Sequence, residues 1–156
     1  MSSTDHDART HDRWTTLDFT GQWRIAAADD TLLRNGVGLD YDHDEWAVTQ
    51  VPGHWQSDPD FAHHDGPFLY RRDFDIEAPS EGRRRFVVFD GIFYQGDVWL
   101  DGAYIGDPEG YFFPHAYDVT ALSRLDTEHV LAVSATCAPQ RDAFRAKIVK
   151  YLTLRH

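Results

Sequence analysis

Short strand-like stretches separated by turn residues constrain this chain more than any other feature. Seven segments rich in aromatic and β-branched residues are bounded by Gly, Pro and Asp, which is the pattern of β-strands. The chain has no room between them for the crossover segments that parallel strands need. An all-β, antiparallel sandwich is therefore expected. The predicted strands cover residues 19–25, 46–51, 68–76, 85–89, 97–100, 103–105 and 129–135.

The predicted strand at 68–76 alternates in character. One set of residues is largely aromatic: Phe68, Tyr70, Arg72, Phe74 and Ile76. The other set is largely charged: Leu69, Arg71, Asp73 and Asp75. Because successive side chains of a strand point to opposite faces, the pattern predicts one core-facing side and one solvent-facing side.

A two-residue hairpin is predicted at Asp101-Gly102. This dipeptide stands between the apolar pairs Trp99-Leu100 and Ala103-Tyr104. Asp-Gly tolerates the positive backbone dihedrals that tight hairpins need, so it is the strongest short-range signal for such a turn.

Composition excludes several classes of protein. The chain has 156 residues, of which 42% are hydrophobic and 14% aromatic, so a folded domain is expected. Its net charge of −11 disfavours nucleic acid and anionic membranes as partners. No apolar run approaches the roughly 18 residues of a spanning helix, and the first residues lack the basic and apolar blocks of a signal peptide. A cytoplasmic location is therefore expected.

Acidic and basic residues are unevenly distributed between the last segment and the rest of the chain. Residues 1–142 contain 11 basic and all 26 acidic residues, whereas residues 143–156 contain four basic residues and no acidic one. Two interpretations of the last segment stay open: an ordinary basic terminal helix, or a non-native stretch from different coding material. Apolar residues at helical spacing predict a helix there. The predicted organisation is a disordered leader at 1–13, a sandwich at 14–142 and this tail at 143–156.

Motifs for catalysis and cofactor binding are missing. No serine lies in a nucleophile elbow, and no glycine-rich segment has the form of a phosphate-binding or dinucleotide-binding loop, so no cofactor is expected. Glycoside cleavage uses two carboxylates about 5–10 Å apart, but the many Asp and Glu residues single out no such pair. A catalytic site therefore cannot be derived from these residues.

The loop between the second and third predicted strands is the best candidate for ligand contact. It contains His54, His63 and His64 together with several Asp residues, and Trp55 and Phe61 offer flat apolar faces for a sugar ring. A plain surface loop and a polar ligand site both remain open, with the surface loop favoured. Adjacent histidines rarely face one metal and no third ligand has the usual spacing, so no metal site is expected.

Six segments in order resemble the N-terminal sugar-binding domain of glycoside hydrolase family 2, which includes β-galactosidases, β-glucuronidases and β-mannosidases. They are LDFTGQWRI at 17–25, WAVTQVPGHW at 46–55, DGPFLYRRDF at 65–74, RFVVFDGI at 85–92, DVWLDGAYIG at 97–106 and GYFFPHAYDVT at 110–120. Asp101 stands where the family usually has Asn, a change that the same turn tolerates. The resemblance covers residues 17 to about 142.

The resemblance implies a jelly-roll sandwich of the galactose-binding-like type in a glycosidase whose catalytic barrel, with two glutamates, lies outside this chain. The chain is thus expected to be a fragment that is inactive alone and packs against the other domains of the enzyme. A free-standing carbohydrate-binding module and a non-catalytic interaction domain, which could complete a homo-oligomer, are the alternatives. By position, the loop at 54–68 would contact a β-glycoside.

Four residues of that loop are the candidate sugar contacts. Asp65 leads, because a carboxylate can accept hydrogen bonds from two neighbouring hydroxyls. His54, Trp55 and His64 accompany it. A purely structural use of Asp65-Gly66 as a turn is the competing interpretation.

Overall fold

The computed structural model describes residues 16–51, 53, 59–61, 63–64, 67–79, 81–89, 95–107, 115–123, 128–136 and 152–155. Within these ranges the chain forms ten strands and one short helix, α2 at Asp30–Asn35. The strands are β1 Thr16–Asp18, β2 Gly21–Ala27, β3 Ala47–Val51, β4 Phe68–Asp75, β5 Phe86–Phe89, β6 Gln95–Leu100, β7 Ala103–Gly106, β8 His115–Asp118, β9 Glu128–Thr136 and β10 Leu152–Arg155.

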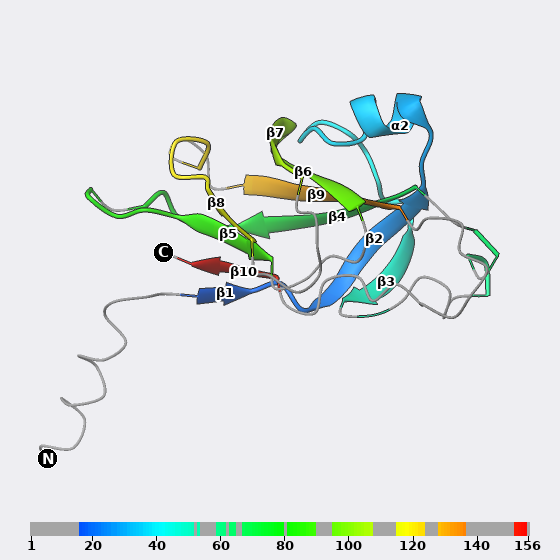
Figure 1. Cartoon of the computed structure of the whole chain (residues 1–156), viewed down its shortest axis with the longest axis horizontal. Helices are drawn as coiled ribbons and strands as arrows, with labels where there is room; N and C mark the ends of the chain where they lie inside the picture. Colours follow the sequence, from blue (N-terminus) through cyan, green and yellow to red (C-terminus); the bar gives the residue numbers. More distant parts are fainter. Residues whose placement is uncertain are drawn as a thin grey trace, which may run out of the picture.

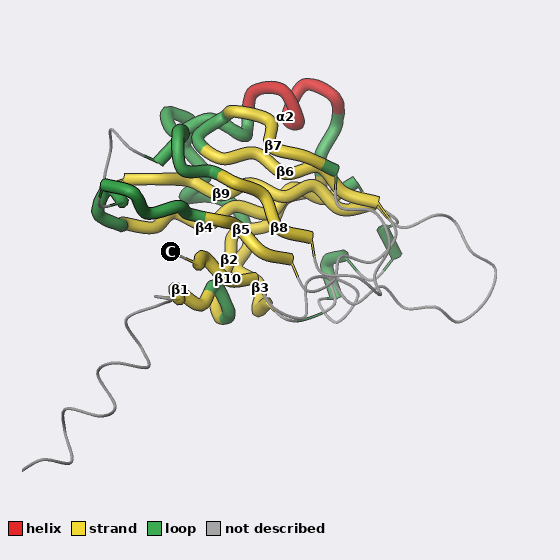
Figure 2. The backbone as a smooth tube through the Cα atoms, turned by 60° about the vertical axis from the view of Figure 1, so that its left-hand side comes forward, coloured by secondary structure: helices red, strands yellow, loops and turns green. Residues whose placement is uncertain are grey.

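Two antiparallel sheets form a sandwich (Figures 1 and 2). The six-stranded sheet has the order β3-β2-β4-β9-β6-β7, and the four-stranded sheet has the order β1-β10-β5-β8. Each of the seven strands predicted from the sequence overlaps an observed strand, so the all-β sandwich is confirmed.

The main core lies between the two sheets. Phe68 and Tyr70 of β4 meet Val87 and Phe89 of β5 in one cluster, and Phe68, Val87 and Phe89 are completely buried. Burying a side chain of this size contributes roughly 1.5–3 kcal/mol. The alternation predicted for β4 is confirmed on this face. It is wrong for Leu69 and Arg71 on the opposite face, which are buried and not solvent-facing because helix α2 and the residues after it cover them.

The hairpin between β6 and β7 turns at Asp101-Gly102, as predicted. Asp101 has φ +52° and Gly102 has φ +84°, the positive pair that a two-residue hairpin requires. The turn is also attached to β9, because Asp101 Oδ1 accepts a hydrogen bond of 2.8 Å from the Val130 N–H.

Helix α2 covers part of the outer face of the six-stranded sheet, on the side away from β1 and β10 (Figure 2). Asp29 caps its N-terminus by accepting a hydrogen bond of 2.8 Å from the Leu32 N–H. Leu32 and Leu33 pack on a second small cluster that contains Leu69 and Ala132. Within the described part of the chain, no helix has the length and apolar character that crossing a membrane demands.

The structure of the tail differs from the helix that was predicted there. Leu152–Arg155 is strand β10, not helix, and it lies between β1 and β5 in the four-stranded sheet. A strand between two others forms backbone hydrogen bonds on both edges, and that gain exceeds the helical preference inferred from apolar spacing. Residues 1–15 and 137–151, which include the predicted leader and the rest of the predicted helix, lie outside the described residues.

Candidate functional site

Most of the candidate sugar loop lies outside the described residues. This holds for His54, Trp55 and Asp65, so the structure does not test whether they converge. His64 is described and exposed. Its backbone N–H donates a hydrogen bond of 3.1 Å to the Phe61 carbonyl, and its ring lies 5.0 Å from that of Phe68.

The end of that loop is fixed to the sandwich. Phe61 packs edge-on against the buried Phe68, with ring centroids 5.2 Å apart. Next to Phe68, the Pro67 carbonyl accepts a hydrogen bond of 2.9 Å from the Ala28 N–H. The loop therefore enters β4 in a defined position.

A second candidate region lies on the outer face of the six-stranded sheet. Residues 36–46, which we call the strap, run from the end of α2 to the start of β3. Two arginines bind its backbone from below: Arg71 Nη1 donates to the Gly36 carbonyl at 2.7 Å, and Arg24 Nη1 donates to the Trp46 carbonyl at 2.9 Å. The strap is thereby held on the sheet at both ends.

Arg71 is the least expected residue of this region. Its side chain is buried, and its guanidinium lies over the Tyr41 ring, 5.7 Å from the centroid. Burial lowers the pKa of Arg71, while the nearby Asp73 carboxylate acts in the opposite direction. Arg71 Nε has no hydrogen-bond partner in the structure. A buried guanidinium with an unused N–H is rare in proteins.

A polar groove opens beside the strap, with a cavity volume of about 420 Å³. Its floor is the outer face of β3, β2 and β4, where Val48, Arg24 and Arg71 form one row across the three strands. His43 and Asp44 of the strap form one wall. His43 Nε2 lies 3.3 Å from Asp73 Oδ2, which ties the strap to β4 at a third point.

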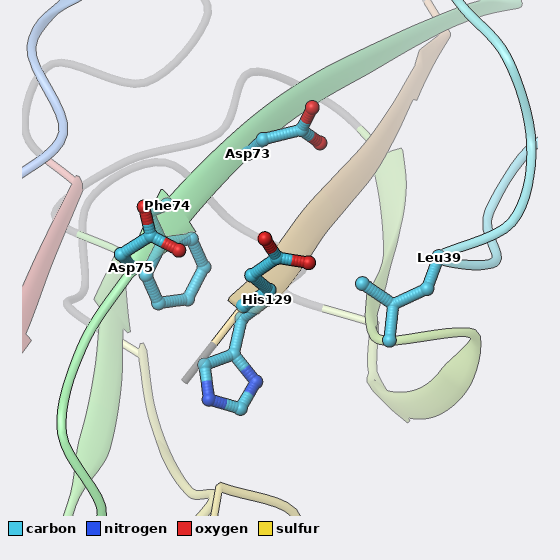
Figure 3. A pocket seen from close by; sticks show the side chains of 6 residues that line it. Leu39, Asp73, Phe74, Asp75 and His129 are labelled. Carbon is cyan, nitrogen blue, oxygen red and sulfur yellow. The ribbon is translucent and has the colours of Figure 1, made fainter. Parts of the chain in front are cut away.

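A second, smaller pocket of about 280 Å³ is also lined by Asp73 (Figure 3). Asp73, Phe74 and Asp75 follow one another along β4, and Leu39 of the strap lies across the pocket. Glu128 also lines the pocket and is the direct cross-strand partner of Asp75. Among the described residues, no group of three His, Cys, Asp or Glu side chains could hold a metal ion.

Sequence reasoning assigned no role to the outer-face groove. The alternation of β4 in the sequence does place two of its lining residues, Arg71 and Asp73, on one side of that strand. The path of the strap over the sheet could not be predicted from the sequence, because it depends on contacts between residues more than 20 positions apart.

Comparison with known proteins gives the family. A family model described as the galactose-binding domain-like domain of glycosyl hydrolase 2 matches residues 56–152. This is more than half of the chain. The chain belongs to glycoside hydrolase family 2. The match includes most of the tail after residue 142, and whether that tail is native stays a prediction.

Curated relatives of this family 2 domain are much longer proteins. A β-galactosidase of Bacteroides ovatus is 27% identical over 135 residues, which cover 79% of this chain and 15% of that protein. A β-glucuronidase of Formosa agariphila is 24% identical over 132 residues, covering 76% of this chain and 13% of that protein. The chain thus spans about a seventh of the length of these relatives, and their catalytic barrel is not contained in it.

Solved structures share the fold. A family 2 member from Bacteroides cellulosilyticus has a TM-score of 0.74 at 21% identity, covering 89% of this chain and 20% of that one. A β-glucuronidase from an uncultured Clostridium has a TM-score of 0.75 at 17% identity, covering 91% of this chain and 29% of that one. The galactose-binding-like sandwich expected for this family 2 domain is therefore confirmed.

Proposed function

We propose that this domain is the sugar-binding and scaffold part of an enzyme that hydrolyses β-glycosidic bonds, as a β-galactosidase does. The relatives that support this proposal are named as glycosidases, and this chain, which matches a galactose-binding-like domain, aligns with only 13–15% of each. The reaction itself would depend on the catalytic barrel, which this chain does not contain. Alone, the chain is expected to cleave no glycoside.

The anchored end of the loop at 54–68 carries the sugar-binding part of the proposal. Phe61 packs against Phe68, and Pro67 is bound to the backbone before α2. A loop fixed at its end loses less conformational entropy when it binds a ligand than a free loop does. Asp65 stands two residues before this fixed point, where its carboxylate would accept hydrogen bonds from sugar hydroxyls.

An NMR titration tests this role. The ¹⁵N-labelled full chain is titrated with galactose, glucuronic acid and mannose, and we expect shifts in the amides of residues 54–68 at millimolar concentrations. Asp65→Asn should weaken them, whereas Asp60→Asn in the same loop is the matched control. The same preparation is assayed with nitrophenyl β-glycosides, and no turnover is expected.

The outcomes separate the alternatives. Shifts at 54–68 without turnover support the proposed domain. No shift with any of the three sugars would contradict sugar binding and favour a pure interaction domain, which could complete an oligomer. Turnover that disappears in Asp65→Asn would show that the chain itself is catalytic, against the proposal.

A further inference from the structure

We propose that the polar groove beside the strap is a second carbohydrate site, which binds a neutral pyranose independently of the loop at 54–68. The inference takes its ligand class from the proposed function and its location from the residues on the outer face. Three observations carry it: a buried guanidinium fixed in the floor of the groove, alternating donors and acceptors, and a balanced charge.

Arg71 makes the groove a built site. It lies on the groove floor and is 1% exposed, with its position fixed by the Gly36 carbonyl and the Tyr41 ring. Such contacts fix a positive charge at the base of the groove. Arg71 Nε has no hydrogen-bond partner in the structure but is itself buried, so Arg71 contributes its charge to the groove and the more exposed neighbouring side chains contribute the hydrogen bonds.

Donors and acceptors alternate across the groove. Arg24 spends Nη1 on the strap carbonyls of Asp44 and Trp46, which leaves its other N–H groups as donors. Asp73 is 62% exposed and has one oxygen near His43, so its second oxygen is an acceptor. Gln22 lies beside them and supplies both kinds of group. A sugar hydroxyl is both donor and acceptor, and this arrangement suits a row of hydroxyls.

The charge of the groove favours a neutral sugar over an acidic one. The cations Arg24 and Arg71 are offset by the carboxylates of Asp44 and Asp73, and the strap adds further acidic residues. The third cation of the lining, Arg72, spends Nη1 on the Phe19 and Thr20 carbonyls. Val48, 46% exposed, offers an apolar patch to the C–H face of a ring. A cavity of about 420 Å³ lies within the range of small-molecule sites.

Titration of the ¹⁵N-labelled full chain with methyl β-galactopyranoside tests the site. Shifts are expected in the backbone amides of Gln22, Arg24 and Val48 and in the side-chain Nε–H signal of Arg24. Asp73→Asn should weaken this binding by roughly tenfold, because a hydrogen bond to a charged acceptor is lost. Asp75→Asn is the matched control, since it makes the same change on the same strand outside the groove.

Each outcome of the titration supports or overturns the second carbohydrate site. Shifts in the groove that weaken in Asp73→Asn and persist in Asp75→Asn, with both variants melting like the parent, support the second site. Shifts confined to residues 54–68 would overturn it and leave the proposed function standing. No shift anywhere would overturn it together with sugar binding by the loop. Tighter binding of methyl β-glucuronide than of the galactoside would overturn the choice of a neutral ligand.

Discussion

His129 Nδ1 lies 2.6 Å from Asp101 Oδ2, and this pair joins the β6–β7 hairpin to the buried start of β9. An ionised carboxylate only accepts hydrogen bonds, so the His129 proton at this contact is on Nδ1. The other carboxylate oxygen accepts from the Val130 N–H. One side chain at the turn thus satisfies two donors of the neighbouring strand.

Asp101→Ala should therefore destabilise the domain by about 2–4 kcal/mol in urea unfolding, because it removes both acceptors at a position with φ +52°. Asp101→Asn is the matched control and should cost less than about 1 kcal/mol, since Asn tolerates this backbone conformation. Its oxygen can accept from Val130 while its amide donates to His129. The proton of His129 should then move to Nε2, as ¹⁵N NMR of the imidazole would detect. Equal stabilities of the two variants would contradict this account.

Gly106→Ala should disturb the contact between the two sheets. A Cβ at Gly106 would lie 2.3 Å from Tyr117 Cε1, closer than any real contact. We expect a loss of about 1–3 kcal/mol, the usual cost of overpacking, measured as a lower melting temperature. Gly38→Ala is the control, since a Cβ there meets nothing within 4 Å. An unchanged melting temperature in Gly106→Ala would show that Tyr117 moves aside without cost.

Thr153→Pro tests the position of β10. Thr153 is the register partner of both Asp18 and Val88, so the strand is paired on both edges. Proline removes a backbone donor and is hardly ever found in an inner strand. Destabilisation of about 1–3 kcal/mol is expected, because an acceptor on the neighbouring strand loses its donor, whereas Thr153→Val keeps the N–H and should cost less. If Thr153→Pro and a chain without residues 143–156 both melt like the parent, the tail contributes nothing to the sandwich.

The Tyr104 hydroxyl should lose its proton at a higher pH than an ordinary tyrosine. Desolvation and the hydrogen bond from its hydroxyl to Asp97 Oδ1 raise the pKa of Tyr104 to about 12, against roughly 10 for an unperturbed tyrosine. The protonated phenol is favoured in the folded state, so its contribution to stability is complete below pH 10 and is lost as the pH rises toward 12. The difference between the ultraviolet titration curves of the parent and of Tyr104→Phe isolates the ionisation of Tyr104. In Asp97→Asn the midpoint should move down toward 10, and an unchanged midpoint would contradict the role of Asp97.

Local sequence signals predicted most of the sandwich. Alternation located strands such as β4 and β9, and Asp101-Gly102 located the hairpin, because both depend on neighbouring residues alone. Helix α2 was missed although its signals are present: Asp29 at the N-cap and Gly36 at the end. Six residues are too few to show a helical period against a background of strands.

Long-range contacts account for what the sequence did not predict. Arg71 is buried because the strap crosses it, and nothing near Arg71 in the sequence indicates that crossing. The stretch Leu152–Arg155 fits either a helix stripe or a strand until β1 and β5 are known to lie beside it. In the candidate loop, only His64 of the four predicted contacts falls on a described residue.

The position of β10 has a consequence for biosynthesis. The six-stranded sheet is assembled from residues 21–136, so all of its strands are available before the end of the chain is made. The four-stranded sheet cannot close until Leu152–Arg155 has left the ribosome and separated β1 from β5. Until then, the apolar inner face of the larger sheet is only partly covered and is exposed to aggregation. The sandwich thus finishes folding only when its last strand is available.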